Sequence, residues 1–256
     1  MSKASPNSTL RSAGFWKRLT GIVLLGGVAV MAALYWQQNV RVHEVEVSGV
    51  YFSDANEIIR IADVPDGIKP DSLDLEALKN RVRSLDYVKD VVPYVEPSGD
   101  LRLDITEREP LALLISGAER VYVDEDGVKL NLLQGKIRNV PVVYGFNTNV
   151  GKDTLKSDEF IQVRDFLQQA RENEFGWATI SEVVFDPKDG VVALSHQNGV
   201  KLLFGRDEFM SKLQNWEAFY AQVIKTKGIE QMQQVDLRFV NQVVTRESDK
   251  KLAINK

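Results

Sequence analysis

The side chains that could transfer protons are few and far apart in this sequence of 256 residues. His43 and His196 are the only histidines, and more than 150 residues separate them. Glu107 and Glu109 lie close together, but an acid–base pair needs two environments that drive the two pKa values apart. Both glutamates fall where a strand is expected to end. We therefore expect solvated histidines and glutamates, and we predict no catalytic residue.

Two short motifs match parts of known functional sites, but the other residues that those sites need are missing. Asp124-Glu125-Asp126-Gly127 is acidic enough to suggest calcium, but a calcium loop needs further oxygen ligands at alternate positions and a bidentate glutamate near its end. The next residues are Val128-Lys129-Leu130-Asn131, so a hairpin turn is expected. Ser248 and Lys251 have the Ser-x-x-Lys spacing of penicillin-binding enzymes, but they lie in a polar tail rather than at the start of a buried helix. We predict no metal site and no acyl-enzyme serine.

The composition excludes further classes of function. The chain has no cysteine, which removes disulfides, thiol nucleophiles and thiolate metal ligands. Four of the 32 basic residues precede residue 19, and the 28 that follow face 36 acidic residues, a net charge of −8. An acidic region with scattered charges does not favour nucleic acid. We expect no enzyme, no cofactor and no nucleic-acid partner.

The C-terminal region offers a binding site of a different kind, the edge of a sheet. A final strand is expected to begin near Gln234. Alternation would let Val235, Leu237 and Phe239 face a core while Asp236 and Arg238 face outward.

This final strand is expected to continue to Val244, with no later element to cover its edge. An open edge exposes N–H and C=O groups to which a partner strand can add. The alternative is an edge guarded by Arg246, Lys250 and Lys251 that has no partner. The predicted partner-binding residues are Leu237, Arg238, Phe239, Asn241, Gln242, Val243 and Val244.

Residues 37–110 predict a small domain that would precede this site. The signals are alternating valines, helix caps and an apolar repeat at helical spacing. The expected elements are a strand over 42–49, helices capped by Ser53 or Asp54 and by Asp74, and strands over 87–95 and 101–107.

Residues 111–246 predict a second domain, mainly an antiparallel sheet with flanking helices. Asp189-Gly190 and Asn198-Gly199 are typical of tight hairpin turns. A last helix would place Trp216 and Tyr220 on its apolar stripe as core supports. The expected strands cover 111–115, 120–123, 128–130, 140–145, 180–185, 191–195 and 200–204, with the final strand after them and helices around Phe160–Ala170 and Phe209–Val223.

The N-terminal region predicts a membrane anchor. Residues 19–36 carry no charged side chain, and 18 helical residues span about 27 Å, close to the hydrocarbon thickness of a bilayer. The preceding residues are basic without an acid, which favours a cytoplasmic N-terminus. A cleaved signal peptide is the alternative, but the apolar run is longer than a usual signal core, and no convincing small-x-small cleavage site precedes the bulky Tyr35-Trp36 pair. Gly21, Gly26 and Gly27 could also permit close approach of a partner helix.

The order of strand, helix, helix, strand and strand behind a single anchor resembles a POTRA domain, a module that handles other polypeptides. The whole chain more closely resembles the FtsQ/DivIB family of bacterial division proteins. Phe239 stands where that family commonly has tyrosine, which keeps the ring for packing and loses a hydroxyl. The matching motifs are Val45-Glu46-Val47-Ser48-Gly49, Val88-x-x-Val91, Leu101-x-Leu103-x-Ile105-x-Glu107-x-x-Pro110-x-Ala112, Val123-Asp124-x-x-Gly127, Val140-Pro141-Val142, Val200-x-Leu202-x-x-Gly205-Arg206 and Val235-Asp236-Leu237-Arg238-Phe239.

This resemblance implies an α+β fold with one transmembrane helix, a POTRA domain and a β domain. It also implies a scaffold at the division site of the bacterial inner membrane, with its C-terminal domain periplasmic, that binds the bitopic proteins FtsB and FtsL. A polypeptide-handling module for secretion or outer-membrane assembly is the alternative. The expected segments are cytoplasmic 1–18, transmembrane 19–36, POTRA 37–110, β domain 111–246 and polar tail 247–256.

Overall fold

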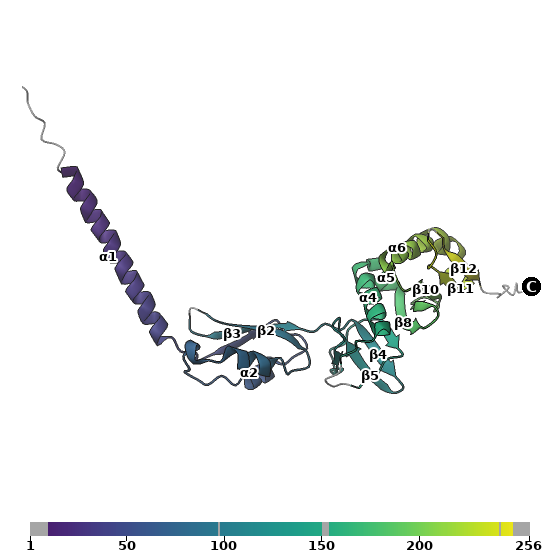
Figure 1. The fold of residues 1–256 in the computed structure, drawn as a ribbon, viewed down its shortest axis with the longest axis horizontal. Coiled ribbons are helices and arrows are strands. Elements are labelled where there is room, and N and C mark those ends of the chain that lie inside the picture. The colour runs from purple at the N-terminus through teal and green to yellow at the C-terminus, as the bar shows by residue number, and fades with distance from the viewer. Residues whose placement is uncertain (1–9, 97, 150–153, 241, 248–256) are drawn as a thin grey trace, which may run out of the picture. The chain divides into compact units, whose positions relative to one another are not determined.

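A computed structural model of the chain describes residues 10–96, 98–149, 154–240 and 242–247 (Figure 1). It divides into two units, which meet in the sequence between Thr106 and Glu107, close to the expected boundary after Pro110. Both units combine helices with strands. The mixed α+β class expected from the sequence is therefore confirmed.

The first unit begins with helix α1 (Leu10–Asn39). The apolar side chains of Ile22, Leu25 and Met31 are exposed along it. Among the residues that the structure describes, no helix combines the length and apolarity needed to cross a membrane. The span predicted over residues 19–36 stays a prediction.

A three-stranded sheet and two helices follow α1, in the expected order of strand, helix, helix, strand, strand. The sheet has the order β1-β3-β2, and β1 runs parallel to β3. The bounds are β1 Val45–Ser48, α2 Ala55–Ala62, the 3₁₀ turn Pro70–Ser72, α3 Leu75–Val82, β2 Val88–Val95 and β3 Leu101–Glu107.

Aspartate caps begin both α2 and α3, as the sequence predicted. A carboxylate oxygen of Asp54 accepts the N–H of Asn56 at 2.7 Å, and one of Asp74 accepts the N–H of Ala77 at 2.9 Å. Such bonds satisfy N–H groups that a helix start leaves without an internal partner. The helices then bury Ile58, Ala62, Leu78 and Val82 in one core with Leu101 and Leu103 of β3.

The second unit contains a nine-stranded sheet of order β12-β11-β10-β9-β8-β7-β4-β5-β6. Five of its neighbouring strand pairs are antiparallel, while β10–β11, β4–β7 and β7–β8 are parallel. The strands are β4 Ala112–Ser116, β5 Glu119–Val123, β6 Lys129–Leu130, β7 Val142–Tyr144, β8 Ile180–Asp186, β9 Gly190–Ser195, β10 Lys201–Gly205, β11 Met232–Asp236 and β12 Val244–Glu247.

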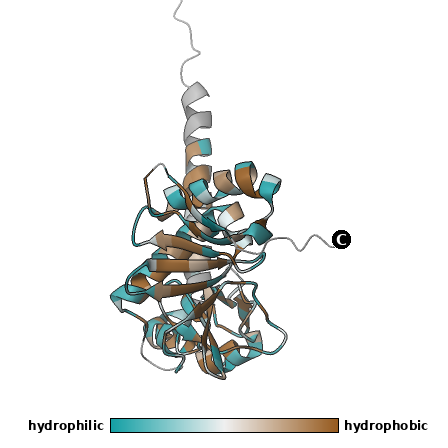
Figure 2. Cartoon of the chain, turned by 90° about the vertical axis from the view of Figure 1, so that its right-hand side faces the viewer, coloured by the Kyte–Doolittle hydropathy of each residue, from teal (hydrophilic) through white to brown (hydrophobic). Residues whose placement is uncertain are grey.

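Helices pack against this sheet and complete the core of the second unit; in Figure 2 the strands are coloured mainly as hydrophobic. Trp216 is fully buried, as expected for a core support, and its indole Nε1–H donates to Thr179 Oγ1 at 3.0 Å. Tyr220 is half-buried beside it. The helical segments are α4 Asp158–Glu172, α5 Glu174–Thr179, α6 Phe209–Phe219, the π-helical turn Tyr220–Ile224, α7 Lys225–Lys227 and the 3₁₀ turn Ile229–Gln231.

Candidate partner-binding site

The final strand ends earlier than the sequence predicted. β11 stops at Asp236, and the chain turns before a separate strand, β12, begins at Val244. The N–H of Gln242 lies 3.4 Å from the carbonyl oxygen of Phe239, which closes the turn. A carboxylate oxygen of Asp236 accepts the backbone N–H of Arg238 at 3.1 Å. Such a local side-chain bond competes with the regular ladder, so a single strand through Val244 was a wrong prediction.

β12 folds back onto β11 and covers the edge that was predicted to be open. The two strands are antiparallel, with Asp236 opposite Val244, Val235 opposite Thr245, and Gln234 opposite Arg246. Among the described strands, β12 pairs only with β11 and forms the end of the sheet. The exposed edge therefore lies at Val244–Glu247, and of the predicted residues only Val244 belongs to it.

The hydrogen bonds of β11 show which groups of β12 face outward. Leu237 donates its N–H to the carbonyl oxygen of Leu203 on β10 at 3.0 Å. Backbone groups of successive strand residues point to opposite sides, so Asp236 directs its N–H and C=O toward β12. Its partner Val244 then bonds to β11, and so does Arg246 two residues later. Thr245 lies between them and directs its N–H and C=O away from the sheet.

The predicted contact residues have several different environments. Leu237 is 1% exposed and belongs to the core. Phe239 is 49% exposed and Val240 is 79% exposed, so the expectation that the Phe239 ring faces the core was wrong. Gln242 is exposed, and Val243 packs partly against the core. Asn241 lies outside the described residues.

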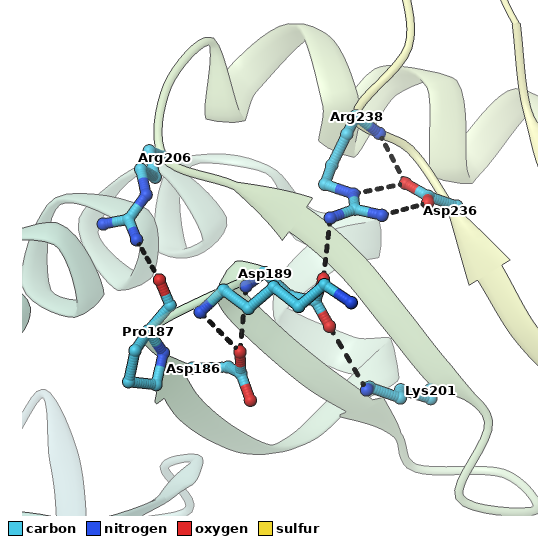
Figure 3. Close-up of polar contacts among 8 residues, drawn as sticks. Asp186, Pro187, Asp189, Lys201, Arg206, Asp236 and Arg238 are labelled. Carbon is cyan, nitrogen blue, oxygen red and sulfur yellow. Dashed lines mark hydrogen bonds and ion pairs between the residues drawn. The ribbon is translucent and has the colours of Figure 1, made fainter.

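Asp236 and Arg238 were expected to face outward, but the structure turns them toward each other and toward Asp189 (Figure 3). Arg238 Nε and Nη2 donate to the Asp236 carboxylate at 2.8 and 2.5 Å, and Nη1 donates to Asp189 Oδ1 at 2.8 Å. Lys201 Nζ lies 3.7 Å from the other oxygen of Asp189. Arg238, Asp236 and Asp189 form a group that we call the Arg238 bridge. It ties the residues after β11 to the turn between β8 and β9.

Ionic contacts within the Arg238 bridge shift the pKa values of its members. Burial alone would raise the pKa of Asp236, but hydrogen bonds from the side chain and backbone of Arg238 outweigh it and lower that pKa. The hydrogen bond to Asp236 raises the pKa of Arg238. Arg238 therefore satisfies charges within this chain and supports the turn.

The other candidates from the sequence form local structural contacts. Asp124 is buried, and one of its oxygens accepts the N–H of Val128 while the other accepts Arg108 Nη1 at 2.6 Å. His43 Nδ1 lies 2.9 Å from an oxygen of Asp66 on the surface of the first unit. Among the described residues no cluster of three or more potential metal-binding side chains occurs. Ser248 and Lys251 lie outside the described residues.

Sequence reasoning missed two parts of the site. The edge residues Thr245, Arg246 and Glu247 follow the predicted strand directly, and their β-branched and charged types gave only a weak signal for a separate strand. Asp189 was recognised as part of a hairpin turn, but no spacing rule connects it with Arg238, 49 residues later.

Comparisons with known proteins identify relatives along nearly the whole chain. A family model described as FtsQ/DivIB, C-terminal related, matches residues 109–246. The cell division protein FtsQ of Rhodothermus marinus is 30% identical over 248 residues, covering 93% of this chain and 90% of that protein. FtsQ of Salinibacter ruber is 26% identical and covers 93% of both chains.

A solved structure gives a looser match. The major extracytoplasmic domain of the division protein DivIB from Geobacillus stearothermophilus aligns with 47% of this chain and 97% of its own, at 17% identity and a TM-score of 0.33. The family model and the Rhodothermus relative carry the conclusion without it. The chain belongs to the FtsQ/DivIB family of cell division proteins.

Proposed function

We propose that this chain is a non-enzymatic scaffold for septum assembly that binds a partner by adding one of its strands to β12. The observation that carries this proposal is the exposed outer edge of β12, at the end of the nine-stranded sheet. All four residues of β12 are exposed. Unpaired backbone groups at such an edge can bond to a partner strand as they would to a neighbour in the sheet.

The opposite end of the same sheet supports this assignment by contrast. β6 has only two residues, Lys129 and Leu130, and both are buried. Lys129 Nζ also donates to the carbonyl oxygen of Asn149 at 2.7 Å. Short and covered edges protect a sheet from unwanted pairing. Since β6 is short and buried whereas every residue of β12 is exposed, β12 is the better candidate for a binding edge.

The family membership supports the kind of partner and the cellular position. We infer that residues 19–36 anchor the chain once in the bacterial inner membrane, with residues 1–18 cytoplasmic and the two units periplasmic at the division site. FtsB-like and FtsL-like bitopic proteins are the proposed partners of β12. The first unit, as a POTRA-type domain, would contact other division proteins separately.

A proline at Thr245 tests strand addition directly. The N–H of Thr245 points away from β11, so Thr245→Pro removes a donor from the open edge while the bonds of Val244 and Arg246 to β11 remain. Proline is tolerated on an edge strand when its missing N–H would have faced solvent. We expect affinity for an FtsB–FtsL pair from the same organism to fall about tenfold or more, because one backbone bond is lost and the ring obstructs its neighbours.

The matched control is Thr245→Val, which keeps the backbone N–H and the β-branched shape. Affinity would be measured by calorimetry, and circular dichroism would establish that both variants fold. A folded proline variant that binds as tightly as the valine variant would exclude β12 as the binding edge. The family membership would stand in that case.

A further inference from the structure

The side chains of β12 indicate which partner strand fits this edge. Val244 and Arg246 lie on the same face of β12, because side chains two residues apart on a strand share a face. Val244 is 40% exposed, and the turn before it presents Phe239 and Val240. On this face the edge therefore presents an apolar side chain, Val244, and two residues later the guanidinium group of Arg246.

Arg246 has no acidic side chain opposite it on this face. Gln234 lies opposite Arg246, and Lys201 lies opposite Gln234 on the next strand, so the row across the sheet reads Arg246–Gln234–Lys201. Among the described residues no ion pair of Arg246 occurs within 4.0 Å. The carboxylate of Asp236, one row away, is 8% exposed and already accepts three hydrogen bonds from Arg238, one of them from its backbone N–H.

On the opposite face of β12, the described side chains present no second charge that lacks an ion pair. Glu247 accepts a bond from Lys227 Nζ at 2.9 Å, so its charge is met within this chain. Thr245 is neutral. The charge that an added strand would meet at this edge is therefore that of Arg246.

Backbone geometry places the side chain opposite Arg246 close to it. The backbone N–H and C=O of Arg246 bond to Gln234 on β11. In an antiparallel addition, Arg246 would therefore form a non-hydrogen-bonded pair with a residue of the new strand. Side chains in such pairs are closer than in hydrogen-bonded pairs. An acidic residue there would gain an ion pair, while a basic residue would meet the like charge of Arg246.

We propose, on the basis of the proposed function, that the β12 edge selects a partner strand with an acidic residue opposite Arg246 and an apolar residue two positions away, opposite Val244. The occupant is thus an extended segment of apolar-x-acidic pattern, read in either direction according to strand polarity. Arg246 determines the preference for charge, and Val244 with the Phe239–Val240 turn determines the preference for an apolar neighbour.

A tethered strand tests this preference without an identified partner. The full chain in detergent would carry the segment Thr-Val-Thr-Glu-Thr-Val-Thr after Lys256, joined by a Gly/Ser linker of about 12 residues, which raises the effective concentration to the millimolar range. The segment reads the same in both directions, so glutamate can lie opposite Arg246 and valine opposite Val244 in either polarity. The matched segment has lysine in place of glutamate.

Hydrogen exchange at the Thr245 amide measures docking, because that N–H points to the open edge. We expect about fivefold greater protection with the glutamate segment than with the lysine segment, since a cross-strand ion pair contributes up to about that factor. The difference should shrink in 1 M salt. In Arg246→Glu the preference should reverse, with unchanged tryptophan fluorescence showing that the core is intact.

The outcomes separate the inference from the proposal on which it rests. Equal protection by both segments, or a preference that persists in Arg246→Glu, overturns the charge selection and leaves strand addition standing. No protection of Thr245 by either segment overturns strand addition at β12 and this inference with it.

Discussion

At the residue scale, the Arg238 bridge makes the free energy of unfolding depend on pH in the acid range. The pKa of Asp236 is lower in the folded chain than in the unfolded one, so its contribution to the free energy of unfolding is present above about pH 4 and is lost as pH falls through the folded value. We expect Asp236→Asn to be less stable than the native chain at pH 7 and to lose less stability between pH 4 and pH 2. Denaturant unfolding followed by tryptophan fluorescence measures both.

The control for the acid prediction is Glu217→Gln, which removes an exposed carboxylate of α6 within the same unit. This variant should retain the native loss of stability below pH 4. If Asp236→Asn declines with pH as steeply as the native chain, the Asp236 carboxylate is not a source of the acid sensitivity.

At the element scale, glycines allow the strand ends around the Arg238 bridge to approach closely. Gly190, which begins β9, has φ of +77°, and a Cβ there would lie 2.4 Å from the carbonyl oxygen of Gly205 at the end of β10. Gly117, in the β4–β5 turn, has φ of +61° and open space around it. The positive φ disfavours alanine at both positions. Only at Gly190 would the added Cβ also collide with a neighbouring atom.

We therefore expect Gly190→Ala to lower the free energy of unfolding by about 2–3 kcal/mol and Gly117→Ala by about 1 kcal/mol. Urea denaturation of the two variants under the same conditions gives the comparison. Equal losses would mean that backbone strain accounts for both and that the approach of Gly190 to Gly205 relaxes without cost.

Elements were predictable from the sequence where local residues specify them. Asp54 and Asp74 bond within three residues of their own positions, and the glycine of Asp189-Gly190 and both residues of Asn198-Gly199 adopt the positive φ typical of hairpin turns. The Arg238 bridge was not predictable, because it depends on Arg238 reaching an aspartate 49 residues away. The parallel pairs of β7 with β4 and β8 were not predictable either, because they join segments that are distant in the chain.

At the scale of the whole molecule, the two units bury separate cores. Leu78 of α3 is fully buried with the residues of the first unit, and Leu167 of α4 is 1% exposed among those of the second. Truncating a buried leucine to alanine typically costs about 2–5 kcal/mol. We expect each loss to remain in its own unit, so that Leu78→Ala speeds amide exchange in β3 and Leu167→Ala speeds it in β9.

Hydrogen exchange with mass spectrometry on the full chain resolves β3 and β9 in separate peptides. Each variant is the control for the other, since both remove the same atoms from a buried site. Faster exchange of β9 in Leu78→Ala, by the same factor as in β3, would show that the units unfold as one. Separate responses would mean that damage to the first unit leaves the β12 edge intact, which is what a scaffold with two independent binding units requires.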